Sequence, residues 1–209
     1  TYSRYKSVIG LLKHSIDGYG HDQLGAANRL RFEQAVSAST DRSPTFCEFF
    51  GPEHILGNIP SFLSYFMVHK VWASKELTRG AGTVTKKLAK WLQREGYAEA
   101  EAARSATNAG AIAARRLPAA QRLVDLLNGC AQVVAIEDPD DLFEGRFMIT
   151  RIDRDQIWLE ELLESYEMGP FILPAEVCEV CEVAWSLSGL VGCVGGRWLI
   201  HEVWKVYPL

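Results

Sequence analysis

The chain of 209 residues is 48% hydrophobic and 23% charged, which is ordinary for a globular protein and argues against extensive disorder. No apolar run approaches the roughly 20 residues that cross a bilayer, and the start of the chain lacks the apolar segment of a secretion signal. Five cysteines at irregular spacing favour reduced thiols over a disulfide framework. We therefore expect a cytoplasmic protein without a membrane span.

The net charge of −4 hides a strong asymmetry along the chain. Residues 1–59 carry six basic and six acidic side chains, residues 60–122 carry eleven and four, and residues 123–209 carry five and sixteen. The middle segment therefore has a net charge of +7 and the last segment −11. Such segregation predicts different partners for the different parts, or association of the basic part with the acidic part.

Apolar residues recur at helical spacing over the first half of the chain. An amphipathic helix is predicted over residues 2–16 and a second helix over residues 22–37, with loop chemistry around Pro44. Ser61 is predicted to open an apolar core helix that extends to Trp72, because that segment is hydrophobic on most of its circumference.

A strongly two-sided helix is predicted next. Gly80-Ala81-Gly82 interrupts the pattern, and Thr83 is a suitable N-cap because its hydroxyl accepts a hydrogen bond from a free backbone N–H. Apolar residues then recur opposite a run of basic residues as far as Gly96. The predicted apolar face comprises Val84, Leu88, Trp91 and Leu92.

Alanine-rich sequence over residues 98–114 favours a further helix, with a break expected between Asn108 and Gly110. Pro118 is expected in the first turn of the last helix, where its missing N–H costs nothing. Asn128-Gly129 is expected to end this helix, since glycine is favoured just past a helix C-terminus.

The pattern then changes to short β-prone runs separated by turn residues. Gly195-Gly196 suits a tight hairpin turn because glycine tolerates positive φ. In the last strand, alternation places Ile200 and Val206 on one face and Val203 on the other. The expected strands cover residues 130–136, 146–152, 157–159, 171–173, 177–185, 190–194 and 197–206.

Together these patterns predict an α+β protein in two domains. Residues 1–128 form an all-helical domain that is basic from about residue 60 to residue 122. Residues 129–209 form a small, acidic, antiparallel β-barrel-like domain, as expected for short strands joined by tight turns.

No complete catalytic, metal or nucleotide-binding motif is present, so we assign no catalytic residue, metal ligand or cofactor. Cys178 and Cys181 have the spacing of half a zinc site, but a second pair is absent, and a regular strand would point them to opposite faces. Cys47 and His54 form a nucleophile pair only if the fold brings their side chains together. A binding protein is favoured over an enzyme, and an enzyme with a site between the domains is the third alternative.

The basic residues between positions 60 and 122 give the strongest indication of function in the sequence. Lysine and arginine neutralise phosphates and release counterions, so a basic helical face is typical of nucleic-acid binding. An ordinary solvated face, or a face docked on the acidic domain, is the alternative. The candidate nucleic-acid-binding residues are Lys70, Lys75, Arg79, Lys86, Lys87, Lys90, Arg94, Arg115 and Arg116.

The segment from Ile59 to Tyr97 resembles the helical core-binding domain of phage integrases and other tyrosine recombinases. In that family an apolar helix leads through a short linker to a helix that ends in a hydrophobic-Leu pair and a glycine, here Trp91-Leu92 and Gly96. The resemblance implies a fold that grips duplex DNA with its basic helix faces. A short acidic β-domain stands where the recombinase catalytic domain should follow, so the resemblance implies DNA binding without recombination chemistry.

We therefore predict a non-enzymatic DNA-binding or regulatory protein whose helical part contacts the phosphates of duplex DNA. The acidic β-domain is expected to orient the complex or to bind a protein partner or a second copy of the chain. The alternative is a protein–protein interaction adaptor, or an oligomer, that does not bind nucleic acid.

Overall fold

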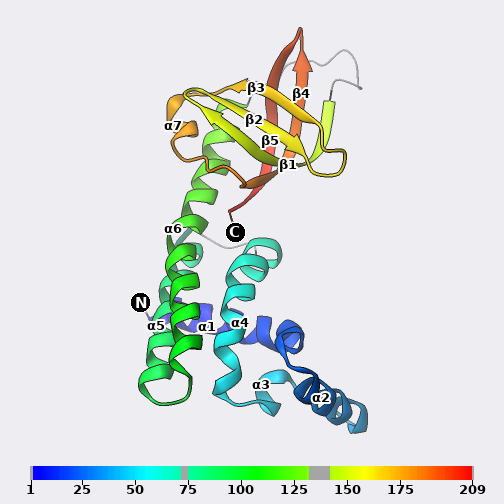
Figure 1. Cartoon of the computed structure of the whole chain (residues 1–209), viewed down its shortest axis with the longest axis vertical. Helices are drawn as coiled ribbons and strands as arrows, with labels where there is room; N and C mark the ends of the chain where they lie inside the picture. Colours follow the sequence, from blue (N-terminus) through cyan, green and yellow to red (C-terminus); the bar gives the residue numbers. More distant parts are fainter. Residues whose placement is uncertain (1, 72–74, 132–141, 209) are drawn as a thin grey trace. The chain divides into compact units, whose positions relative to one another are not determined.

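The computed structural model describes residues 2–71, 75–131 and 142–208, without the side chain of Lys75. The chain divides into two compact units, Thr1–Arg115 and Arg116–Leu209. Helices build the first unit, and a β-barrel dominates the second (Figure 1). The predicted α+β class, helical first and β-rich second, is therefore confirmed.

The helices of the first unit follow one another through short connections, and the two helices predicted near the N-terminus are present as α1 and α2. In chain order the helical segments are α1 (Tyr2–Tyr19), η1 (Gly20–Gln23), α2 (Ala26–Ala38), α3 (Phe46–Phe49), η2 (Pro52–His54), α4 (Ile55–Ser61), the π-helical η3 (Phe62–Lys70), α5 (Lys75–Arg94) and α6 (Ala100–Cys130).

The apolar core helix begins earlier than its sequence suggests. Helix α4 starts at Ile55 and continues through Pro60 directly into η3, so Ser61 does not open a helix. A proline in a helix removes one backbone hydrogen bond, but Leu56, Ile59 and Phe62 are at most 2% exposed. Their burial on both sides of the proline outweighs that loss. Trp72, the predicted end of this helix, lies outside the described residues.

Two predicted helix breaks are wrong, because α5 is continuous through Gly80-Ala81-Gly82 and α6 is continuous through Gly110. Thr83 lies inside α5 and Pro118 inside α6, so neither residue begins a helix. A Cβ atom on Gly82 would lie 2.4 Å from the carbonyl oxygen of Gly110. A Cβ on Gly110 would in turn lie 2.8 Å from the carbonyl oxygen of Gly82. These glycines therefore permit close approach of the α5 and α6 backbones and do not act as hinges.

The second unit is a closed five-stranded barrel with the strand order β1-β2-β3-β5-β4. Its pairings are antiparallel, except that β3 and β5 pair in parallel at Phe171 and Trp198 and so close the barrel. The predicted hairpin turn is present, with φ of +58° at Gly195 and +76° at Gly196. The elements are β1 (Leu142–Asp153), β2 (Gln156–Glu161), β3 (Glu167–Ile172), α7 (Ala175–Cys178), β4 (Ser186–Val194) and β5 (Arg197–Tyr207).

The strand predicted over residues 177–185 is wrong, because the short helix α7 and turns occupy this stretch. Pro174 precedes α7, where its fixed φ suits a helix start. Val177, Cys178 and Cys181 are all buried, at a helical rather than an alternating spacing. The predicted run over 130–136 begins within α6, and its residues from 132 onward lie outside the described part of the chain.

Strand β5 departs from strict alternation. Ile200, Val203 and Val206 are all at most 5% exposed, although an unbroken strand would turn Val203 away from the other two. The β4–β5 register shifts twice, between Ser188 and Gly189 and between Leu190 and Val191. Each such irregularity resets which side chains face inward, which explains the three-residue spacing of the buried side chains.

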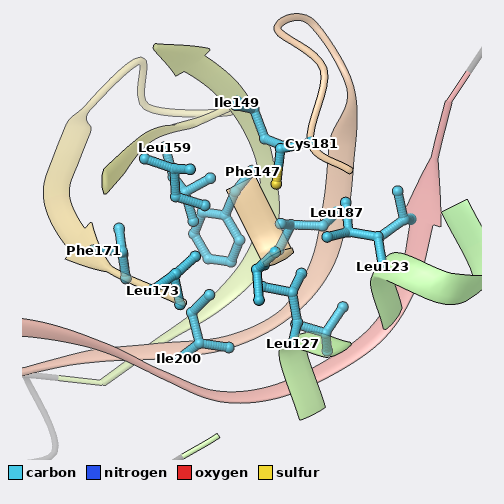
Figure 2. Close-up of a cluster of buried hydrophobic side chains, with 14 of the residues drawn as sticks. Leu123, Leu127, Phe147, Ile149, Leu159, Phe171, Leu173, Cys181, Leu187 and Ile200 are labelled. Atoms are coloured by element: carbon cyan, nitrogen blue, oxygen red, sulfur yellow. The ribbon is translucent and has the colours of Figure 1, made fainter. Parts of the chain in front are cut away.

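The end of α6 contributes to the barrel core. Leu123 and Leu127 are fully buried among side chains of the strands, including Phe147 and Leu187 (Figure 2). The amide side chain of Asn128 donates to the Val203 carbonyl oxygen (2.7 Å) and accepts from the Val203 N–H (2.8 Å). The boundary between the two compact units therefore falls inside α6, between Arg115 and Arg116. The predicted domain boundary, after residue 128, lies instead near the end of this helix.

Candidate nucleic-acid interface

Basic residues line one side of α5. At 100° per residue, Arg79, Lys86, Lys87, Lys90 and Arg94 fall within a sector of roughly 100°, and we call these five residues the α5 basic face. Four of them are exposed and Lys86 is half-buried. The opposite side of α5 is buried, with Ala81, Val84, Ala89 and Leu92 at most 2% exposed.

Packing on both flanks fixes the rotation of α5 about its axis. The Gly82–Gly110 approach holds α6 against one flank, where Lys86 Cβ would lie 3.0 Å from a Cβ on Gly110. On the other flank, the Arg4 side chain of α1 lies over Gly80, 2.7 Å from where a Cβ would stand. The basic face lies between these two contacts and is therefore directed toward solvent.

The charges of this face are largely uncompensated. Arg94 forms an ion pair with the adjacent Glu95, at 2.8 Å between Nη2 and Oε1. Among the residues that the structure describes, no carboxylate lies within 4.0 Å of the charged nitrogens of the other four members. Lys87 instead has its Nζ over the ring of Tyr5, 5.7 Å from the centroid. Three exposed cations, Arg79, Lys87 and Lys90, and the half-buried Lys86 thus have no acidic partner in the described part of the chain.

The remaining predicted residues do not extend this face as a single group. Lys70 is exposed at the end of η3, with its Nζ 5.8 Å from the Tyr65 ring centroid, and Arg115 is exposed on α6. The backbone of Lys75 begins α5, but its side chain is outside the described atoms. Arg116 belongs to the second unit, where its guanidinium binds Glu182 at 2.7 Å.

Sequence reasoning misplaced Trp91 and overlooked Tyr97, two aromatic residues beside this face. Trp91, predicted on the apolar side of α5, is 43% exposed, and Tyr97 just past the helix is 49% exposed. The helical spacing already indicated that Trp91 lies close to the basic residues, because it follows Lys87 by one helical turn and Lys90 by one residue. That position is at the border between the apolar and basic sectors.

The alternative nucleophile pair is not assembled. The Cys47 backbone N–H donates to Asp17 Oδ1 at 2.8 Å, and burial together with this carboxylate raises the pKa of the Cys47 thiol to about 11. His54 packs against the Phe50 ring, 4.7 Å between centroids. Cys47 is therefore a protonated structural thiol at neutral pH and not an activated nucleophile.

Cys178 and Cys181 are likewise buried thiols. Burial raises the pKa of Cys181 to about 12 and also raises that of Cys178, which disfavours the thiolate that binds metals. Over residues 2–71, 75–131 and 142–208, no group of three or more His, Cys, Asp or Glu side chains is arranged to hold a metal ion.

Comparison with known proteins adds no function to this geometry. No protein-family model, curated protein or solved structure matches the chain. The resemblance to the core-binding domain of tyrosine recombinases stays a prediction. In the part of the chain that the structure describes, none of the helices is both long and apolar enough to span a membrane.

Proposed function

We propose that the helical unit binds nucleic acid by contacting backbone phosphates with the α5 basic face. The observation that carries this proposal is the group of three exposed cations, Arg79, Lys87 and Lys90, that together with the half-buried Lys86 lack an acidic partner among the described residues. Cations that do not form ion pairs are available for phosphate contacts, and each contact releases counterions from the nucleic acid.

The charges of the two units support a contact confined to the first. Unit Thr1–Arg115 carries fifteen basic and ten acidic side chains, whereas Arg116–Leu209 carries seven and sixteen. The barrel unit therefore has a net charge of −9 and repels phosphate,. This repulsion orients the bound strand toward the helices, in keeping with a binding or regulatory role without catalysis.

The test is a salt series with labelled 20-base-pair duplex DNA. The variant Arg79→Ala/Lys87→Ala/Lys90→Ala removes three exposed cations of the face. The control Arg29→Ala/Arg31→Ala/Arg104→Ala removes three exposed arginines elsewhere in the same unit, so both variants have the same net charge. We expect the slope of log K against log salt to fall by about 2.7 in the first variant only, at roughly 0.9 per phosphate contact.

Two outcomes would contradict the proposal. No binding of the wild type to this duplex at low salt would exclude a role for this face in binding duplex DNA. Equal losses in both triple variants would show that binding follows the net charge of the unit and not the arrangement of cations on α5.

One observation favours a second function, protein association through the barrel. Leu163, in the loop between β2 and β3, is 92% exposed, and its neighbour Leu162 is 41% exposed. The loop is nevertheless held in place, because Glu161 Oε2 accepts hydrogen bonds from the backbone N–H groups of Leu163 (2.7 Å) and Glu164 (2.6 Å). An apolar side chain displayed on an already ordered loop loses little conformational entropy on binding.

The surroundings of this loop indicate the chemistry of its partner. Four carboxylates flank the exposed leucines, at Glu160, Glu161, Glu164 and Glu167. They fit a basic surface with apolar side chains at its edge, and the α5 basic face of a second copy, bordered by Trp91, meets that description. The second candidate function is therefore self-association in which DNA competes for the same face.

Sedimentation velocity over a range of protein concentrations tests this candidate. Self-association should weaken in Leu163→Ser, in high salt and on addition of duplex DNA. The control Leu30→Ser, at a residue of α2 that is 55% exposed, should leave it unchanged. A wild-type chain that stays monomeric at all concentrations and low salt would exclude the second candidate.

A further inference from the structure

Trp91 and Tyr97 form an aromatic pair at the C-terminal end of α5. Their ring centroids are 6.0 Å apart and their planes are inclined by 42°. Nearly half of each residue remains in water, at 43% and 49% exposure. Their mutual contact therefore does not bury them.

The helix end holds both rings in position. Gly96 has a φ of +76°, its N–H donates to the Gln93 carbonyl oxygen at 3.1 Å, and the Tyr97 N–H donates to the Leu92 carbonyl oxygen at 2.9 Å. This is the hydrogen-bond pattern of a Schellman cap, in which the residue after the glycine packs back on the last turns of the helix. Tyr97 is thus fixed beside Trp91 by the backbone and needs little ordering when a ligand binds.

The pair continues the flank of the basic face on which Tyr5 lies. The half-buried Tyr5 ring lies under Lys87 Nζ, and Trp91 follows Lys87 by one turn of the same helix. One cation, Lys87, therefore lies between the Tyr5 ring and the Trp91–Tyr97 pair along this flank. Cations that follow a backbone beside rings that accept bases are the two components of single-strand binding sites.

We infer that Trp91 and Tyr97 stack on unpaired bases, so that the α5 basic face prefers single-stranded nucleic acid to duplex. This inference rests on the proposed phosphate-binding function and adds the class of ligand. In a duplex the faces of the bases are covered by their neighbours, and only their edges are accessible in the grooves. A single strand that lies along the cations of α5 leaves its base faces free for the two rings.

The experiment measures the anisotropy of labelled dT12, U12 and a 12-base-pair DNA duplex at one salt concentration. Trp91→Leu and Tyr97→Leu keep an apolar side chain at the helix end but remove a ring, and Trp91→Phe restores a smaller one. Trp204→Leu, at a residue of the barrel that is 45% exposed, is the matched control. The preference between dT12 and U12 identifies DNA or RNA as the ligand.

Wild type should bind at least one single strand more tightly than the duplex. Trp91→Leu should weaken that binding about tenfold or more, leave duplex binding within about twofold and leave the salt slope unchanged, since no phosphate contact is lost. Trp91→Phe should recover part of the loss, and Trp204→Leu should bind like wild type.

The result that overturns this inference is a Trp91→Leu variant that binds single strands like wild type or loses single strands and duplex equally. If Arg79→Ala/Lys87→Ala/Lys90→Ala abolishes binding in the same experiment, the phosphate-binding proposal survives while the stacking inference fails. If wild type binds none of the three ligands, both are wrong.

Discussion

The cations of the barrel unit and those of the α5 basic face make different contacts. In the barrel, the Arg146 guanidinium lies 4.0 Å from the centroid of the Tyr207 ring and donates to Ser186 Oγ. Arg151 lies at the same distance over Trp158, and Arg116 binds Glu182. On α5, by contrast, Arg94 pairs with Glu95 and Lys87 lies over the Tyr5 ring, whereas the other three members of the basic face have no ion pair or ring contact among the described residues. The position of a cation relative to its own fold, and not its residue type, therefore indicates whether it stabilises the protein or is free for a ligand.

The packing of the two units differs in a related way. Large side chains fill the barrel, with Phe147, Phe171 and Trp185 at most 2% exposed. The α5–α6 contact in the helical unit instead depends on two glycines whose backbones approach each other. Removing volume should therefore be the severe change in the barrel, and adding volume the severe change at the helix crossing.

The largest effect is expected for Leu127→Ala. Leu127 is completely buried among barrel side chains although it lies on a helix. The cavity should lower the free energy of unfolding of the barrel by about 2–5 kcal/mol. Urea unfolding followed by tryptophan fluorescence measures it, since four of the six tryptophans lie in Arg116–Leu209. A change as small as that of the exposed-site control Leu163→Ala would show that the end of α6 does not belong to the barrel core.

The next effect is expected for Gly82→Ala. A methyl group there would lie 2.3 Å from the backbone nitrogen of Ala114, so the helices must separate at a cost of about 1–3 kcal/mol. The matched control is Gly10→Ala in α1, where a Cβ would meet nothing within 4 Å and helix propensity should add up to about 1 kcal/mol. Urea unfolding followed by circular dichroism compares the two. Stabilisation by both substitutions would contradict the close helix crossing.

These glycines also show what local sequence could and could not predict. Amphipathic spacing predicted α1 and the basic side of α5 because burial of one face determines that pattern. Gly82 and Gly110 were interpreted as breaks because glycine has low helix propensity, whereas tertiary contact between the two helices requires them. The same limit applies to Val203, whose burial depends on register shifts between β4 and β5 that no single strand reveals.

The candidate site could likewise be predicted only in part from the sequence. Charge and spacing predicted four members of the α5 basic face on one helix, whereas Arg79 was a candidate on the segment before the expected break at Gly80. The sequence could not separate them from Arg116, because the Glu182 carboxylate that neutralises this residue is distant in sequence and is brought close only by the fold. Trp91 was assigned to the core because hydrophobicity indicates the average position of a residue type, whereas a side chain at the border of two sectors can be exposed.

The substitutions Arg146→Ala and Lys90→Ala test whether a barrel cation stabilises the fold while an α5 cation serves ligand binding. Arg146→Ala removes the contact with Tyr207 and the hydrogen bonds to Ser186, and should cost about 1 kcal/mol of barrel stability. Lys90→Ala should change stability by less than about 0.5 kcal/mol while it weakens nucleic-acid binding. Urea unfolding and the salt series supply the two measurements. Equal destabilisation by both substitutions would remove the distinction between the units.

The smallest effect is expected for a paired cation of the helical unit, Lys13, which binds Asp17. Burial alone would raise the pKa of the Asp17 carboxyl, but hydrogen bonds from Lys13 and from the Cys47 N–H lower it below its ordinary value of 3.8. A carboxyl with a lowered pKa in the folded state stabilises the fold above its unfolded pKa, and this stability is lost as the pH falls through the folded pKa.

Asp17→Asn should therefore reduce stability at pH 6 by less than about 1 kcal/mol, because solvent screens the partly exposed pair. The difference from wild type should shrink toward pH 3, as wild-type Asp17 becomes protonated. Urea unfolding of both chains at the two pH values measures this change. A difference that stays constant between pH 6 and pH 3 would mean that Asp17 acts through the geometry of its hydrogen bond to Cys47 and not through its charge.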